Sequence, residues 1–355
     1  MTKCRAALRT VAEKGSKTGS MKDIIRLFCS VCLCAFPLFA QASGSGTKAF
    51  DFIKIDDNAR TIAMGGATVA MPNDAYGIGT NPASIAYVSK TQAEAGYFKY
   101  NADAWGGPLA YVTPYKNDGV LGGYVSYLSH GSLSASDALD ENGESTGASW
   151  HVFSLVGGLS WAKQFVSNLA TGVTVKGIYH AIESSQGDHI SATGLAVDVG
   201  GQYRLSTKTQ VIIGGAVRNL GFVVSNYSED MENLSLPLSA TVGVSVIPSQ
   251  LPELRIALDL EQSNDDYLNY KAGAEYQVVP GFFLRGGYTF SEKDLENAFS
   301  SFSGSSSDTY EKSNANGLSL GAGFVTTFNG ITTNIDAAYL QSLDPCFALT
   351  FLFTY

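Results

Sequence analysis

The histidines are the residues that first suggest chemistry, because a catalytic nucleophile needs a base and histidine is the usual one. The chain has four, His130, His151, His180 and His189. No Ser, Asp or Asn stands beside them in a pattern typical of a catalytic site. Their types and spacing also form no recognisable set of metal ligands. We therefore expect no enzyme activity, no metal site and no cofactor.

Most of the cysteines lie in what looks like a leader. Met21–Arg26 is short and basic, Leu27–Ala40 is apolar, and Ala40-Gln41-Ala42 is typical of a cleavage site. This pattern predicts a signal peptide, a start at Met21 and a mature N-terminus at Ser43. About 14 apolar residues are too few for a membrane-spanning helix. Only Cys346 follows the leader, so the mature chain has no internal disulfide.

Composition narrows the class of protein further. Charged residues make up 15% of the chain, against roughly 25% in soluble domains. Residues 43–355 hold 16 Lys and Arg against 30 Asp and Glu, and this acidic balance argues against a nucleic-acid partner. No apolar run after the leader is long enough for a membrane helix. The exported chain is therefore either soluble or a closed β-barrel.

Alternation of apolar and polar residues favours strands. In residues 254–261, Leu or Ile occupies every even position, and Arg, Ala, Asp and Glu occupy the odd ones. Residues 270–278 alternate in the same way, with Tyr, Ala and Val on one face. Fourteen such segments are expected: 91–101, 105–114, 119–130, 149–163, 168–182, 190–204, 208–220, 236–248, 253–263, 267–279, 281–291, 315–328, 330–341 and 345–355.

The connections between these segments indicate what kind of sheet they form. Several connections after odd-numbered segments are long: 131–148, 183–189, 221–235 and 292–314. Those after even-numbered segments are tight turns. This asymmetry and the even strand count are typical of outer-membrane barrels. We predict an all-β fold, a closed antiparallel transmembrane β-barrel of about 14 strands embedded in outer-membrane lipid.

The last segment supports this localisation. Residues 347, 349, 351, 353 and 355 are all Phe, Leu or Tyr on one face, ending in Tyr355. Such a strand resembles the signal read by the outer-membrane assembly machinery, which is therefore an expected partner. In a soluble protein it would be an aggregation-prone edge. In a barrel it pairs with the first strand.

The expected register turns several charged side chains toward the barrel lumen. We expect a cross-strand ion network among residues of three consecutive strands. Its functional interpretation is contact with an N-terminal plug or with a ligand carboxylate, and its simpler interpretation, which we favour, is a paired or solvated wall. The expected lumen charges are Lys176, Asp198, Arg255, Asp259, Lys271, Glu275 and Arg285.

Residues 43–90 lack the long alternation and carry three short motifs instead. Ala59-Arg60 precedes Met64-Gly65-Gly66-Ala67, Asp74-Ala75 follows, and Asn81-Pro82-Ala83 comes last. This segment is too short to form a core of its own. We expect three parts in the chain: a leader over residues 1–42, a compact element over 43–90 that lies inside the barrel, and the barrel over 91–355.

These motifs, in this order between a signal peptide and fourteen strands, resemble the N-terminal hatch of the FadL-type outer-membrane long-chain fatty acid transporter superfamily. That superfamily includes the PorV-like barrels of the type IX secretion system and a group of spirochaetal relatives. The resemblance covers essentially the whole mature chain. It implies a barrel whose lumen is plugged by the hatch, with Arg60, Gly65, Gly66, Asp74 and Asn81-Pro82-Ala83 as hatch and gate residues.

The transporter branch of the superfamily implies a function as well. Its members take up hydrophobic molecules from outside and release them sideways where the third strand kinks, near the Asn-Pro-Ala stretch. In this chain Gly122-Gly123 is the candidate kink, because glycine weakens strand pairing. Other glycine pairs, such as Gly157-Gly158 and Gly286-Gly287, also lie in strands. The alternative is that glycine pairs only relieve crowding in the wall.

Three functions follow from this resemblance. The first is uptake of long-chain fatty acids or similar hydrophobic molecules, with lateral release and without a cofactor. The second is a PorV-like barrel that binds and shuttles secreted proteins. The third is a general porin, which a plugged lumen opposes. Fatty acid binding, a retained secreted protein or high conductance would distinguish them.

Overall fold

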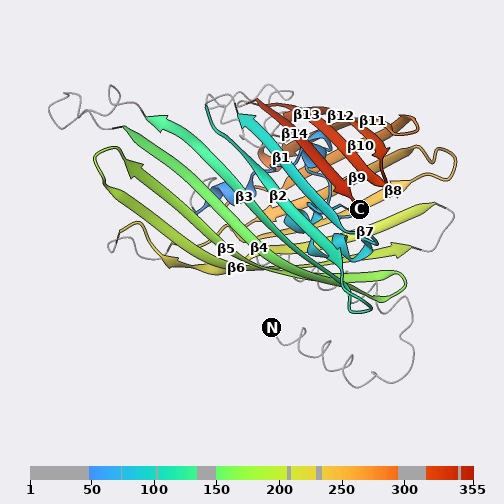
Figure 1. The fold of residues 1–355 in the computed structure, drawn as a ribbon, viewed down its shortest axis with the longest axis horizontal. Helices are drawn as coiled ribbons and strands as arrows, with labels where there is room; N and C mark the ends of the chain where they lie inside the picture. Colours follow the sequence, from blue (N-terminus) through green and yellow to red (C-terminus); the bar gives the residue numbers. More distant parts are fainter. Residues whose placement is uncertain are drawn as a thin grey trace, which may run out of the picture. The chain divides into compact units, whose positions relative to one another are not determined.

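The computed structural model describes residues 48–72, 74–100, 103–133, 149–205, 209–228, 234–294, 317–342 and 345–355. The expected leader, with Met21 and the cleavage site, lies outside these residues. In the described part, fourteen antiparallel strands form a closed barrel (Figure 1). The strands are β1 (Gln92–Tyr100), β2 (Trp105–Pro114), β3 (Val120–Leu133), β4 (Trp150–Val166), β5 (Leu169–Ser184), β6 (His189–Leu205), β7 (Gln210–Ser225), β8 (Ser239–Ile247), β9 (Leu254–Ser263), β10 (Asn269–Val279), β11 (Phe282–Ser291), β12 (Gly317–Phe328), β13 (Ile331–Gln341) and β14 (Cys346–Thr354).

The last strand closes the barrel on the first, as predicted. Gln92 of β1 lies opposite Thr354 of β14 on one side and opposite Val112 of β2 on the other. All other neighbours in the barrel are consecutive in the sequence. This closure leaves the aromatic strand β14 paired on both sides, so it presents no open edge.

The two faces of the wall have opposite polarity. On the outer face, Leu159 and Phe328 are each 76% exposed. On the inner face, Asp198 and Gln202 are fully buried. A soluble sandwich turns its polar face outward, whereas this barrel turns its apolar face outward, as lipid requires. The chain is therefore an outer-membrane β-barrel.

The barrel wall is not equally long all the way round. Strands β3 to β7 have 14 to 17 residues, whereas about 9–11 residues suffice for a tilted strand to cross a membrane. Strand β8 has only 9. Because β8 begins opposite Arg218, residues 220–225 of β7 pair with β6 alone.

The N-terminal segment, residues 48–90, folds into short helices. These are η2 (Asp51–Lys54), α3 (Ala59–Ala63), α4 (Gly77–Thr80) and η3 (Pro82–Tyr87). The side chain of Asn58 caps α3 by accepting a hydrogen bond from the Thr61 amide at 3.1 Å. Across the described residues, no helix has the length and apolarity to cross a membrane.

Candidate functional site in the barrel interior

The N-terminal segment crosses the lumen between two parts of the wall. Helix α3 contacts strands β11 to β14, whereas η3 contacts β3 to β6. Figure 1 shows these short helices enclosed by the strands. Ala59, Met64, Ile78 and Asn81 are all fully buried. The segment therefore fills the interior and has two separate attachments to the wall.

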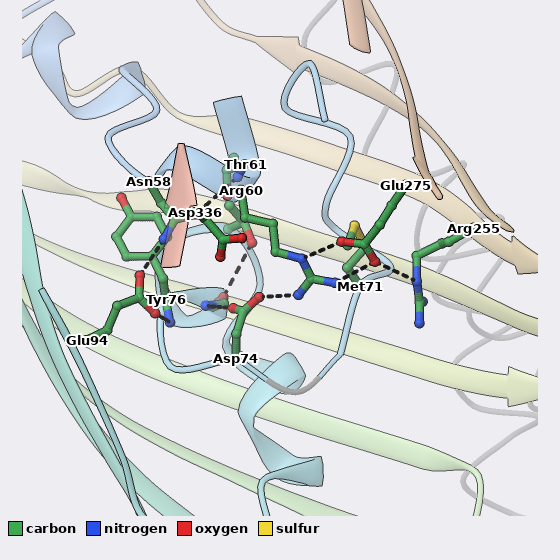
Figure 2. A network of polar contacts seen from close by, with 12 residues as sticks. Asn58, Arg60, Thr61, Met71, Asp74, Tyr76, Glu94, Arg255, Glu275 and Asp336 are labelled. Atoms are coloured by element: carbon green, nitrogen blue, oxygen red, sulfur yellow. Dashed lines mark hydrogen bonds and ion pairs between the residues drawn. The ribbon is translucent and has the colours of Figure 1, made fainter. Parts of the chain in front are cut away.

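The attachment near α3 is an ion cluster centred on Arg60. Its guanidinium donates from Nε to Oε2 of Glu275 at 3.0 Å and from Nη2 to Oε1 at 3.1 Å. Nη1 donates to Oδ2 of Asp74 at 2.8 Å. Figure 2 shows Arg60 reaching between these two carboxylates. Burial lowers the pKa of Arg60, but the two carboxylates outweigh it and raise the pKa above its ordinary value, so Arg60 stays charged.

The wall extends this cluster beyond Arg60. Arg285 of β11 donates to Glu275 at 2.7 Å and to Asp336 of β13 at 2.6 Å. Arg255 of β9 lies 3.7 Å from Glu275 (Figure 2). Three arginines thus face Glu275, Asp336 and Asp74, so the charges within the cluster balance. A largely buried cluster of this kind specifies one docked position, since removing one member leaves a charge uncompensated.

A second carboxylate of the wall holds the backbone of the segment. Asn58 Nδ2 donates to Oε1 of Glu94, and the Tyr76 amide donates to Oε2 at 3.2 Å (Figure 2). Asp74 joins the two parts of the segment, since its Oδ1 also accepts from the Gly77 amide at 2.8 Å. The alternation of β1 places Glu94 in the lumen, but only the path of the segment gives it these partners.

The attachment near η3 combines amide hydrogen bonds with the guanidinium of Arg204 in β6, which lies 3.4 Å from the centre of the Tyr87 ring. Asn81 Nδ2 donates to the carbonyls of Val69 at 2.7 Å and of Gly201, in β6, at 3.2 Å. Its Oδ1 accepts from the Ala83 amide at 3.0 Å and so caps η3. Pro82 is at the first position of this helix, where its missing N–H costs nothing. Asn81 therefore joins the segment, the helix start and the wall.

Glycines in the wall make room for this attachment. A Cβ added to Gly172 of β5 would lie 2.4 Å from the carbonyl carbon of Pro82, and one on Gly200 of β6 would lie 2.0 Å from Oδ1 of Asn81. On the other side, Gly65 has a φ of +60°, and its added Cβ would lie 2.6 Å from the Tyr288 amide nitrogen. Backbone therefore approaches backbone at both attachments.

Gly66 has a φ of +72°, and a Cβ on it would meet Asp56 Oδ2 at 3.0 Å and Lys271 Nζ at 3.2 Å. The structure thus brings Arg60, Asp74 and Asn81-Pro82-Ala83 against the wall, with Gly65 and Gly66 at the turn after α3. Gly65 and Gly66 both adopt the left-handed conformation that favours glycine. The turn after α3 therefore explains why the Met64-Gly65-Gly66 motif contains two glycines.

The other expected lumen charges also face inward but have separate partners. Lys176 donates to Asp198 at 2.8 Å and to Oδ1 of Asn219 at 2.5 Å. Lys271 pairs with Glu261 at 2.9 Å, not with Asp259. Asp259 instead accepts from the Val69 amide at 2.9 Å. The expected single network is therefore several small ones, and two of its members, Glu275 and Asp259, bind the N-terminal segment.

A small cavity remains between η2, α4 and the wall. Its volume is about 40 Å³, and Phe52, Phe98 and Leu128 form its apolar side. Asp56, Asp57, Lys176 and Arg218 supply charged groups. A cavity of this size holds a water molecule or two but is smaller than the roughly 150 Å³ that admits benzene. This cavity therefore admits only a small group, such as one end of a larger molecule.

A larger apolar depression of about 730 Å³ lies on the outer face over β14 and β1 to β4. Leu109, Leu121 and Leu159 line this depression, and Gly123, which has no side chain, leaves space between them. On the inner side, a Cβ added to Gly122 would lie 2.7 Å from Cδ1 of Ile78. At these two glycines, a single layer of backbone separates the depression from the N-terminal segment.

Strand β3 is nevertheless regular at Gly122-Gly123, the expected kink. Gly122 lies opposite Val112 of β2 and Ser160 of β4, and pairing continues through Gly123. The register shift in β3 lies between Ser129 and Ser132. Close packing of Ile78 explains Gly122 without a kink, because the apolar side chain needs the space.

Two of the four histidines, His130 and His180, lie together beside Phe52 of the N-terminal segment. His130 Nε2 lies 2.6 Å from Oγ of Ser154, and its ring lies 5.5 Å from that of His180. Phe52 packs on both rings, at 6.3 and 6.1 Å. His189 lies 3.2 Å from the Tyr179 hydroxyl. Within the described ranges, no group of three potential ligands is placed to hold a metal.

Comparison with known proteins identifies solved structures that have a similar fold. No family model matches the sequence, and no curated protein matches it significantly. Among solved structures, the toluene transporter TodX of Pseudomonas putida gives a TM-score of 0.60 at 15% identity, covering 84% of this chain and 98% of TodX. The monoaromatic hydrocarbon channel CymD gives 0.55 at 14% identity, covering 84% and 97%. The chain therefore shares the barrel fold of TodX and CymD, and the predicted fold is confirmed.

Proposed function

We propose that this protein transports hydrophobic molecules across the outer membrane, with the N-terminal segment as its hatch. The observation that carries this proposal is the lumen itself. A membrane-spanning barrel encloses a segment that is attached to opposite parts of its wall, and a cavity between this segment and the wall measures only about 40 Å³. A lumen occupied in this way opposes a general porin, whose lumen is a water-filled channel.

The similar structures support a hydrophobic cargo. TodX is described as a toluene transporter and CymD as a monoaromatic hydrocarbon channel. The resemblance in the hatch motifs adds long-chain fatty acids as a candidate class. Binding of any of these would be mainly apolar, contributing about 0.8 kcal/mol for each buried methylene.

Lateral release at Gly122-Gly123 is the second part of the proposal. The apolar depression on the outer face lies directly behind these glycines, and Ile78 of the hatch lies before them. A hatch movement that withdraws Ile78 would leave a thin, apolar part of the wall between lumen and lipid. The pairing of β3 with β2 must then open locally, because the register is continuous here.

Transport into lipid vesicles tests both parts. Purified barrel would first be extracted for mass spectrometry of bound lipids and then reconstituted, and uptake of labelled toluene and a labelled long-chain fatty acid would be followed. Gly123→Leu fills the outer depression, and we expect about tenfold slower uptake. Gly286→Leu is the matched control, because a Cβ there meets nothing closer than Leu320 at 3.8 Å. Disruption of Asn81-Pro82-Ala83 should abolish saturable binding.

Other outcomes would replace the proposal. A barrel that takes up neither probe but retains a secreted protein through purification would be a shuttle of the PorV kind. High conductance of the unaltered protein in planar bilayers would indicate a porin. Uptake that Gly123→Leu leaves unchanged would keep the transport function but reject the lateral route.

A further inference from the structure

Asp57 is a buried carboxylate whose hydrogen bonding is incomplete. It is 4% exposed and lines the small cavity between η2, α4 and the wall. The Ser126 hydroxyl of β3 donates to its Oδ2, whereas Oδ1 is buried without a hydrogen-bond partner. In the described part of the chain, no ion pair involves Asp57. A buried acceptor left without a donor costs about 1–3 kcal/mol, so this atom calls for an explanation.

The cations that line the same cavity are already engaged. Lys176 donates to Asp198 and Asn219. Arg218 donates to Glu261 at 3.1 Å and to the Gly79 carbonyl at 3.2 Å. Nε of Arg218 is buried without a hydrogen-bond partner, but the guanidinium already has Glu261 as its anion. The cavity therefore presents a carboxylate without a cation, whereas each cation in its lining already has an anion.

The rest of the lining suits the polar end of an apolar molecule. Phe52, Phe98 and Leu128 give it an apolar side, and Asp56 adds a second carboxylate. A volume of about 40 Å³ exceeds the ~10–15 Å³ that one water needs. It accommodates a group of one or two heavy atoms.

We propose that this cavity receives the head group of the transported molecule, and that the head is a hydrogen-bond donor, with an ammonium as the strongest case. The inference rests on the proposed function and narrows its cargo. A donor completes the bonding of Asp57, and a positive charge is attracted by Asp56 and Asp57 together. A carboxylate meets the repulsion of both, and Lys176 and Arg218 are already paired with Asp198 and Glu261. Fatty acids therefore bind more weakly than amines of equal size.

Calorimetric titration of the purified full-length barrel tests this with four probes that share one ring: benzylamine, benzyl alcohol, toluene and benzoate. We expect affinity to fall in that order at about pH 8, where the amine carries a positive charge and Asp57, with a pKa of about 7, is mostly ionised. Benzylamine should bind about tenfold or more tightly than benzoate, since a hydrogen bond to a charged group contributes about 1.5–3 kcal/mol.

Three variants sharpen the result. Asp57→Asn removes the charge but keeps an oxygen that accepts from Ser126, and it should bring the amine-to-benzoate ratio close to one. Ser126→Ala leaves the carboxylate in place, so the preference for the amine should persist. Asp188→Asn, in an exposed turn, should change nothing. The heat-dependent mobility of each barrel on a gel checks that it is folded.

The outcomes separate this inference from the proposed function. Equal binding of all four probes, or a ratio that Asp57→Asn leaves unchanged, overturns the head-group assignment and keeps a hydrophobic transporter. Tighter binding of benzoate than of benzylamine also overturns it. Failure of every probe to bind rejects the transport function, and the head-group assignment with it.

Discussion

The two attachments of the N-terminal segment differ in the forces that hold them. Around α3, Arg60 enters a cluster in which three arginines face three carboxylates. Around η3, Asn81 and Pro82 lie against the backbone of Gly172 and Gly200 with no charge among them. The first attachment depends on ion pairs, whereas the second depends on close packing, on amide hydrogen bonds and on the stacking of Arg204 against Tyr87.

This difference indicates which side of the N-terminal segment can detach from the wall. A charged cluster can exchange its partners for water or for a ligand, since each ion is well solvated when exposed. Close-packed backbone has no comparable alternative partner, and its contacts are lost when it separates. We therefore expect the α3 side to open and the η3 side to stay in place as the hinge.

The largest effect should follow removal of the charged attachment. Arg60→Met leaves Asp74 and part of Glu275 without their cation, and breaking a buried pair costs about 3 kcal/mol or more. We expect lower stability in urea titrations and new openings in planar-bilayer recordings. Lys163→Met breaks an exposed pair with Asp118 at 3.7 Å and should cost less than about 1 kcal/mol. Equal effects of the two variants would contradict a special role for Arg60.

A methyl group should disturb the close-packed attachment almost as much. In Gly172→Ala, the new Cβ must push Pro82 away, and such overpacking costs about 1–3 kcal/mol. Gly177→Ala in the same strand is the control, because nothing lies within 4 Å of its added Cβ. Urea unfolding of both variants measures the difference. If Gly172→Ala is as stable as the control, the η3 side is looser than the structure indicates.

Loss of the Asn81 amide should have a smaller effect that sharpens the contrast. Asn81→Ala removes three hydrogen bonds of about 1 kcal/mol each, partly compensated where carbonyls keep other donors. We expect about 1–2 kcal/mol lower stability, with bilayer recordings that stay closed because the α3 cluster is intact. Frequent openings in this variant would mean that η3, and not α3, is the mobile side.

The smallest effect concerns pH. Burial raises the pKa of Asp57 to about 7, although the Ser126 hydrogen bond opposes the shift. A carboxylate with a raised pKa is neutral below about pH 7, so benzylamine should bind more tightly as pH rises through 7. Asp56, Lys176, Arg218, Tyr76 and Tyr124 also face the cavity. Asp57→Asn separates their contribution, because only the part of the pH dependence that belongs to Asp57 disappears.

Much of the fold was predictable because strand alternation is a local property. Apolar Leu258 and charged Asp259 must face opposite sides of any strand, so the wall and its inner charges followed from the sequence. Partners across the lumen were not predictable in this way. Glu275 binds Arg60, 215 residues away, and only the path of the N-terminal segment brings them together. Asp57 gave no signal, because nothing near it in the sequence reveals its burial.

The contact between Ala59 and Thr350 bears on the order of folding. The Ala59 amide donates to Oγ1 of Thr350 in β14 at 3.0 Å across 291 residues of sequence. A segment made early by the ribosome therefore meets this partner only after the whole wall has been made. Contacts of such long range form late, since loop closure precedes any gain from them. Docking of the segment should therefore follow completion of the barrel. In a chain that stops before β14, the segment should not dock in the lumen.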